Sequence, residues 1–62
     1  MTKKVIVAKA KHVREGYRIL TERGWLLVTD SEPWFENGSI KVTFDDGDWE
    51  TFAPKERVVM MR

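Results

Sequence analysis

Residues 39–52 read Ser-Ile-Lys-Val-Thr-Phe-Asp-Asp-Gly-Asp-Trp-Glu-Thr-Phe, and this stretch decides the fold class. Its first half alternates apolar and polar side chains with the two-residue period of a strand that has one buried face. The Asp-Asp-Gly that follows is typical of a hairpin turn, after which residues 48–52 form the returning strand. The stretch therefore predicts a β-hairpin whose first strand directs Ile40, Val42 and Phe44 into the core.

The rest of the chain consists of short runs between glycine and proline breaks, which favours an all-β domain. We expect five strands and a short 3₁₀ turn at residues 53–56, before the last strand. An amphipathic helix over residues 11–23 stays open as an alternative, with Gly24 as its stop, and would make the fold α+β. Gly16 in the middle of that helix would cost about 1 kcal/mol. The expected strand segments are residues 3–10, 17–20, 25–29, 34–35, 39–44, 48–52 and 57–61.

The composition restricts the function classes. A chain of 62 residues forms one domain, residues 1–62, and buries only about 60% of its unfolded surface, which leaves no room for a deep catalytic cleft. The chain has no cysteine and one histidine, His12, so neither a thiolate nucleophile nor a zinc site is expected. Small secreted domains usually need disulfides, so we expect a cytoplasmic, non-enzymatic protein without metal or cofactor and without a membrane partner.

The order of elements resembles that of SH3-like barrels. Residues 40–61 combine an apolar-x-apolar strand, an Asp-Gly turn, an acidic and aromatic strand and a closing Val-Val, and they resemble Tudor-like and KOW-like members. The whole chain also looks like short barrel proteins of bacteriophages. The resemblance implies a five-stranded SH3-like barrel; it implies no particular ligand, because fold does not carry function.

The first hairpin supplies one candidate binding residue. A two-residue turn at Asn37-Gly38 would pair Phe35 with Ile40 on the core face. Trp34 would then lie opposite Lys41 on the outer face.

The second hairpin supplies another candidate binding residue. A three-residue Asp-Asp-Gly loop with a glycine bulge would pair Trp49 with Thr43, so that Trp34 and Trp49 flank Lys41 on one exposed face. A two-residue Asp-Gly turn would instead pair Trp49 with Phe44 and bury it. An exposed pair of tryptophans would bind a base, a methylated lysine or a side chain of a protein partner.

A second candidate surface is basic. Residues 1–24 carry seven basic and two acidic side chains, although the whole chain has a net charge of only +1. Lys9 and Lys11 would share one side of an extended chain, with Arg14 at the following turn and Arg18 beyond it. Such a row could bind phosphates, and it could equally be a solvated strand edge.

These features favour a small binding module over an enzyme. The leading hypothesis is a phage or mobile-element accessory protein that acts through protein–protein contacts, in the host cytoplasm if it is phage-encoded. The alternatives are nucleic-acid binding through the basic N-terminal third and a structural homo-oligomer. The first ranks ahead because nucleic-acid binders are usually more basic than this chain.

Overall fold

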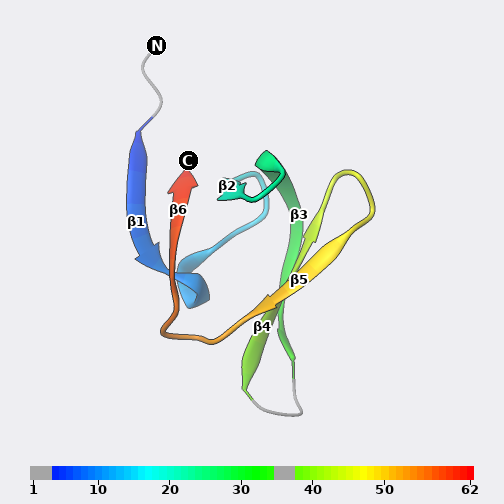
Figure 1. The fold of residues 1–62 in the computed structure, drawn as a ribbon. Helices are drawn as coiled ribbons and strands as arrows, with labels where there is room; N and C mark the ends of the chain where they lie inside the picture. Colours follow the sequence, from blue (N-terminus) through cyan, green and yellow to red (C-terminus); the bar gives the residue numbers. More distant parts are fainter. Residues whose placement is uncertain (1–3, 35–37) are drawn as a thin grey trace.

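The computed structural model describes residues 4–34 and 38–62 and shows an all-β chain (Figure 1). No helix in this part of the chain is longer than one 3₁₀ turn. The elements are β1 (Val5–Lys9), the 3₁₀ turn η1 (Ala10–His12), β2 (Arg18–Thr21), β3 (Gly24–Trp34), β4 (Ser39–Phe44), β5 (Trp49–Phe52) and β6 (Arg57–Met61).

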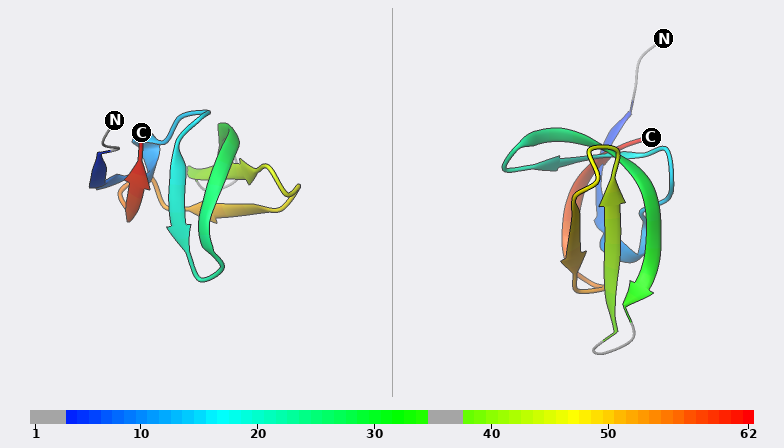
Figure 2. Two further views of the ribbon diagram at one scale, coloured as in Figure 1. Left: turned by 90° about the horizontal axis from the view of Figure 1, so that it is seen from above. Right: turned by 90° about the vertical axis from the view of Figure 1, so that its right-hand side faces the viewer.

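All six strands belong to one antiparallel sheet, in the order β1-β6-β2-β3-β4-β5. The 11-residue β3 takes part in both halves of this sheet, because it pairs with β2 along its first residues and with β4 along its last. A bulge between Val28 and Asp30 separates the two sections, and Figure 2 shows how β3 curves between the two halves. The sheet therefore curls around its inner face and leaves two outer faces, one on each half.

The inner face holds the core. Its centre is formed by the fully buried side chains of Ile19, Phe44 and Met60, which come from three different strands. Ile6 and Ala8 of β1 pack against this centre from one end of the sheet. The complete set of buried core residues is Ala10, Val13, Ile19, Val28, Val42, Phe44, Val58 and Met60.

The helix over residues 11–23 is absent, and that alternative is wrong. His12 ends the single 3₁₀ turn, and Arg18 starts β2, which bonds to both β3 and β6. Gly16 explains the outcome, since its φ of 92° lies outside the helical region.

The predicted count of five strands is also wrong, because the structure has six. The expected segment 17–20 does form a strand, β2, and it is separate from the other five. The expected 3₁₀ turn before the last strand is a single hydrogen-bonded turn, in which the Glu56 amide donates to the Ala53 carbonyl at 3.0 Å. The 3₁₀ element lies instead at Ala10–His12, where β1 ends and the chain crosses toward β2.

The β4–β5 hairpin has the predicted three-residue loop. Thr43 pairs with Trp49, and the Phe44 amide donates to the Asp48 carbonyl at 2.8 Å. Gly47 has a φ of 90°, which a glycine bulge requires. The two-residue alternative, which would have buried Trp49 against Phe44, is therefore wrong, and Val42 and Phe44 point inward as expected.

The β3–β4 register differs from the prediction by two residues. Ile40 pairs with Pro33 and Lys41 with Glu32, while Trp34 lies opposite Ser39. The expected pairing of Trp34 with Lys41 is therefore wrong. Because a shift of two residues keeps each side chain on its face, Trp34 still lies on the outer side. Two predictions lie outside the described residues, because residues 35–37 are not part of them. These are the core position of Phe35 and the Asn-Gly turn that begins at residue 37.

Candidate functional site

The outer face of the β3–β4–β5 half carries the cluster of Trp34, Lys41 and Trp49. The two indole rings stack with their centroids 5.9 Å apart and an angle of 24° between their planes. The Lys41 ammonium nitrogen lies 5.1 Å from the ring centroid of Trp34 and 4.9 Å from that of Trp49. Three strands thus bring the three predicted residues together, one residue from each.

Within this cluster the cation-binding position is already occupied by the protein itself. The lysine lies within the roughly 6 Å range of a cation–π contact with both rings. An added methylated lysine or other cation would have to displace Lys41 first. The Trp49 side chain is still 51% exposed, so its outer surface can contact a partner. Lys41 therefore takes the cation position beside both rings, and the accessible part of the cluster is a small aromatic surface on Trp49.

The predicted basic row is not continuous. The expectation that Lys9 and Lys11 share one side of an extended chain is wrong, because the 3₁₀ turn begins at Ala10 and redirects the backbone. Lys9 pairs with Arg57 at one end of the outer sheet face, and Arg18 pairs with Met61 near the other end. Four residues of strand separate these positions by about 13 Å.

The other two residues of that row, Lys11 and Arg14, lie together in the connection between β1 and β2. The Arg14 guanidinium donates through Nη1 to the carbonyls of Lys11 and Val13, at 3.1 and 3.0 Å. These bonds fix the arginine beside η1. The four cations therefore do not form one row: Lys9 and Arg18 lie toward opposite ends of the outer sheet face, and Lys11 and Arg14 lie in the crossing loop.

The outer face of the β1–β6–β2–β3 half is a surface that sequence reasoning identified only in part. Residues that pair across antiparallel strands share a face, so the registers define its members. None of them is acidic, and seven of the ten are apolar. We call this set the apolar outer face: Val5, Val7 and Lys9 of β1; Arg57, Val59 and Met61 of β6; Arg18 and Leu20 of β2; and Trp25 and Leu27 of β3.

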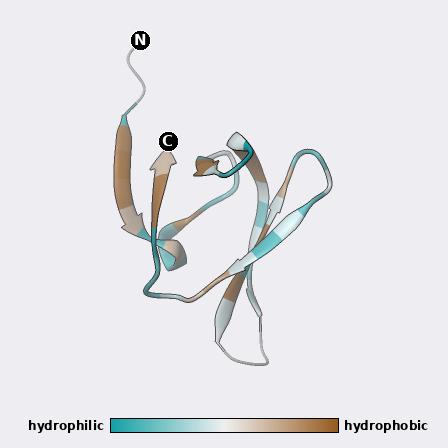
Figure 3. Ribbon diagram, viewed as in Figure 1, coloured by the Kyte–Doolittle hydropathy of each residue, from teal (hydrophilic) through white to brown (hydrophobic). Residues whose placement is uncertain are grey.

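The apolar outer face contains four of the most exposed large hydrophobic side chains in the described chain. Val5 is 53% exposed, Val7 58%, Leu20 46% and Trp25 39%. Figure 3 shows hydrophobic segments along β1 and β6, strands that carry apolar residues on both faces. Scattered exposed hydrophobic residues need no explanation, whereas a contiguous set on one sheet face is typical of an interaction site.

A sequence signal for this face was available. Residues 5–8 read Val-Ile-Val-Ala, with no polar residue on either face of the strand. A strand that is apolar on both faces is typical of a sheet covered on both sides. The run itself predicts a strand, but it does not show which other strands contribute to the outer face.

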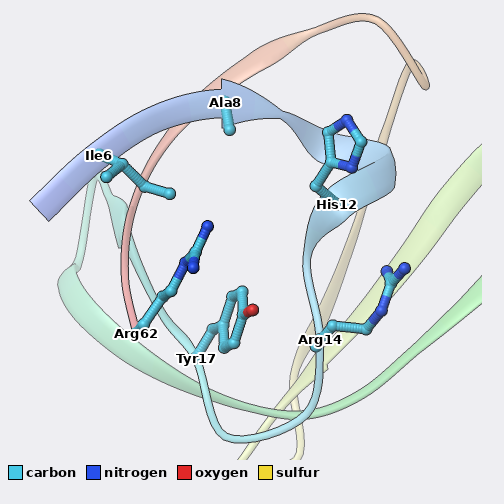
Figure 4. A pocket seen from close by; sticks show the side chains of 6 residues that line it. All are labelled: Ile6, Ala8, His12, Arg14, Tyr17 and Arg62. Atoms are coloured by element: carbon cyan, nitrogen blue, oxygen red, sulfur yellow. The ribbon is translucent and has the colours of Figure 1, made fainter. Parts of the chain in front are cut away.

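A hollow of about 410 Å³ lies on the inner side of β1, beneath the connection to β2. Figure 4 shows the Arg62 side chain reaching into this space between β1 and Tyr17. Arg14 and His12 stand at its other end, so its polar side chains are basic or neutral and none of them is acidic. The lining residues are Ile6, Ala8, His12, Arg14, Tyr17 and Arg62.

The acidic turn between β4 and β5 forms ion pairs with an arginine side chain of the chain itself. Arg23 Nη1 contacts a carboxylate oxygen of Asp46 at 2.9 Å and one of Asp48 at 2.7 Å. Asp46 also accepts a hydrogen bond from the Asp48 amide at 2.9 Å, as turn aspartates commonly do. These carboxylates therefore tie the β4–β5 turn to the β2–β3 turn.

Comparisons with known proteins supply no relative: no family model, no curated protein and no solved structure matches the chain. Nor do the described residues include a helix with the length and apolar character of a membrane span. The surfaces described above are thus the basis for a functional assignment.

Proposed function

We propose that the protein is a non-enzymatic binding module whose apolar outer face contacts a protein partner. The single observation that carries this proposal is the set of exposed apolar side chains on one face of β1, β6, β2 and β3. In a module of this kind, the six-stranded sheet acts as a small SH3-like barrel that presents a surface rather than enclosing a site.

The chemistry of the face favours protein over nucleic acid. Val7 pairs with Val59 in the middle of β1 and β6, and Leu20 pairs with Trp25 on the neighbouring strands. The cations lie toward the ends, with Lys9 opposite Arg57 at one end and Arg18 near the other. Nucleic-acid surfaces need a continuous run of cations along the phosphates, whereas protein interfaces combine an apolar centre with a polar rim. The absence of acidic residues among its ten members further favours a partner that carries carboxylates.

A capture experiment with matched variants tests the proposal. The tagged protein is incubated with extract of its source cell, with and without nuclease, and bound proteins are identified. Leu20→Lys changes the centre of the apolar outer face, and Thr51→Lys adds the same charge to the opposite outer face, where Thr51 pairs with Lys41. Circular dichroism confirms that each variant keeps its strands.

We expect a defined protein that survives nuclease treatment, is lost with Leu20→Lys and is retained with Thr51→Lys. Loss of all captured material after nuclease would instead favour the nucleic-acid alternative. Equal retention by both variants would show that the apolar outer face is not the contact surface.

A further inference from the structure

The strand β1 ends the sheet on one side. In the order β1-β6-β2-β3-β4-β5, its only strand neighbour within the described chain is β6. The other edge of β1 therefore presents backbone amide and carbonyl groups to which an additional strand can bond. Edge strands are commonly protected by a charge or a proline. In β1 a charge stands at Lys9, the last residue of the strand, whereas Val5–Ala8 carry neither a charge nor a proline.

The two faces of β1 differ in chemistry. Val5 and Val7 belong to the apolar outer face and are more than half exposed. Ile6 and Ala8 point to the other side, where they line the 410 Å³ hollow. A strand added beside β1 would alternate its side chains in the same way, one set over the valines and the other over the hollow.

The hollow selects the charge of the side chains that enter it. Arg62 reaches into it, and Arg14 is held at its end by two backbone carbonyls. None of the lining side chains is a carboxylate, so these guanidinium groups favour an anionic group, and guanidinium binds carboxylates with two parallel hydrogen bonds. Tyr17 adds a hydroxyl that can donate another bond.

We propose that an extended partner segment with alternating apolar and acidic residues adds as a strand beside β1. Its apolar side chains cover Val5 and Val7, and its carboxylates enter the hollow beside Arg14 and Arg62. This inference rests on the proposed function and specifies the partner: a protein segment recognised by its backbone, its period of two and its negative charge.

A second copy of the chain fits this edge poorly. Two β1 strands paired antiparallel about Val7 would place Ile6 of one copy opposite Ala8 of the other. The basic hollows would then lie on the same side of the joint sheet and next to each other. Like charges at such close range oppose association, so the acidic segment is the better occupant.

The probe is a synthetic seven-residue peptide that alternates valine and glutamate, acetylated and amidated at its ends. It is titrated into the 15N-labelled full chain and followed by amide chemical shifts. We expect saturable shifts at Val5–Lys9 and slower hydrogen exchange of those β1 amides that point away from β6. Two control peptides replace glutamate by lysine or by serine, and we expect no binding for the first and weaker binding for the second.

N-methylated peptides test whether the backbone forms the contact. Methylation of alternate residues removes either the amides that face β1 or those that face solvent. The side chains are the same in both, so only the first peptide should fail to bind. Equal binding of both peptides would overturn strand addition.

Two arginine variants test the hollow. Arg62→Gln and Arg14→Gln together should weaken binding of the valine–glutamate peptide about tenfold, while the serine peptide is unaffected. Lys55→Gln removes a charge from the exposed turn before β6 and should change affinity less than twofold. Arg14→Lys retains the charge and guards against a folding defect from the loss of the Arg14 bonds to the loop.

The outcomes separate this inference from the proposed function. If Leu20→Lys abolishes capture of the natural partner but no alternating peptide shifts the β1 amides, the apolar outer face binds protein and strand addition is wrong. If the lysine peptide binds as well as the glutamate peptide, the charge assignment of the hollow is wrong. Sedimentation that shows a dimer at micromolar concentration would assign the edge to a second copy instead.

Discussion

The two outer faces of the sheet handle their exposed hydrophobic side chains in different ways. On the β3–β4–β5 half, Trp34 and Trp49 stack on each other, and Lys41 lies against both rings. On the β1–β6–β2–β3 half, the side chains of Val5 and Val7 are 53% and 58% exposed. On the first face the aromatic side chains contact each other and a cation of the protein. On the second face the exposed apolar side chains are accessible to a partner.

This difference shows that an aromatic residue at the surface is not by itself the best indicator of a binding site. Indole rings can gain stability from each other and from a cation, so they can be retained for the fold alone. Exposed β-branched residues gain little from their own neighbours when they face solvent. A partner that covers them therefore provides the stronger explanation.

A substitution in the core beneath both faces should cause the largest loss of stability. Phe44 is fully buried between the two halves, and Phe44→Ala should cost about 3–5 kcal/mol. A domain of this size is stabilised by about 5 kcal/mol at most, so the variant should be largely unfolded at 25 °C. Thermal melting by circular dichroism measures this, and Phe44→Leu, which retains most of the volume, should melt in between. A folded Phe44→Ala variant would contradict the described core.

The tryptophan cluster should give an intermediate effect. Trp49→Ala removes the ring stack and one cation–π contact, and we expect a loss of about 1–2 kcal/mol, smaller than that for Phe44→Ala. A double-mutant cycle with Lys41→Met should give a coupling energy of about 0.5–1 kcal/mol. Urea denaturation measures both values. A coupling of zero would mean that the cluster does not stabilise the fold, and the contrast between the faces would disappear.

The ion pairs between the two turns should contribute less. Arg23→Gln removes the contacts with Asp46 and Asp48, and both partners are partly exposed to solvent. We expect a loss of about 0.5 kcal/mol at low salt and no difference from wild type in 1 M salt. Urea denaturation at the two salt concentrations checks this. A larger, salt-independent loss would indicate that Arg23 packs rather than pairs.

The valines of β1 should give the smallest effect on folding. Val5→Thr and Val7→Thr keep the β-branched shape, and we expect each to change stability by less than about 0.5 kcal/mol. The double variant should bind the neutral dye Nile red more weakly than wild type, because both valines contribute exposed apolar surface to the apolar outer face. A loss comparable to that of Trp49→Ala would mean that these valines serve the fold, and that the apolar outer face is structural.

The sequence determined the fold class and one hairpin well. The alternation from Ile40 to Phe44 and the Asp-Asp-Gly loop predicted the β4–β5 hairpin and limited it to two registers. The structure has the register of the three-residue loop, in which Gly47 takes a positive φ. The β3–β4 register could not be obtained in the same way. An Asn-Gly pair favours a two-residue turn locally, but a shift by two residues preserves which side chains are buried, so the core pattern does not distinguish the registers.

The candidate sites were predictable to different degrees. The cluster around Lys41 followed from the two-residue period, which survives an error of two in the register. The hollow beside β1 could not be anticipated, because it joins Ile6, Arg14 and Arg62 from distant parts of the sequence. The apolar outer face depends on β6 lying between β1 and β2, an order that no local pattern specifies.

Site-specific photocrosslinking tests the central claim most directly. A benzophenone amino acid is placed at Val7, at Leu20 or, as the matched control on the other outer face, at Thr51. All three positions are exposed and lie on strands. Cells that produce each version are irradiated, and the adducts are identified by mass spectrometry.

We predict that the probes at Val7 and Leu20 crosslink to the same protein partner and that the probe at Thr51 does not. Adducts from Thr51 with none from Val7 or Leu20 would place the contact on the tryptophan side of the sheet. Adducts to nucleic acid alone at Val7 and Leu20, or no adducts at either position, would contradict the assignment of the apolar outer face as a protein-binding surface.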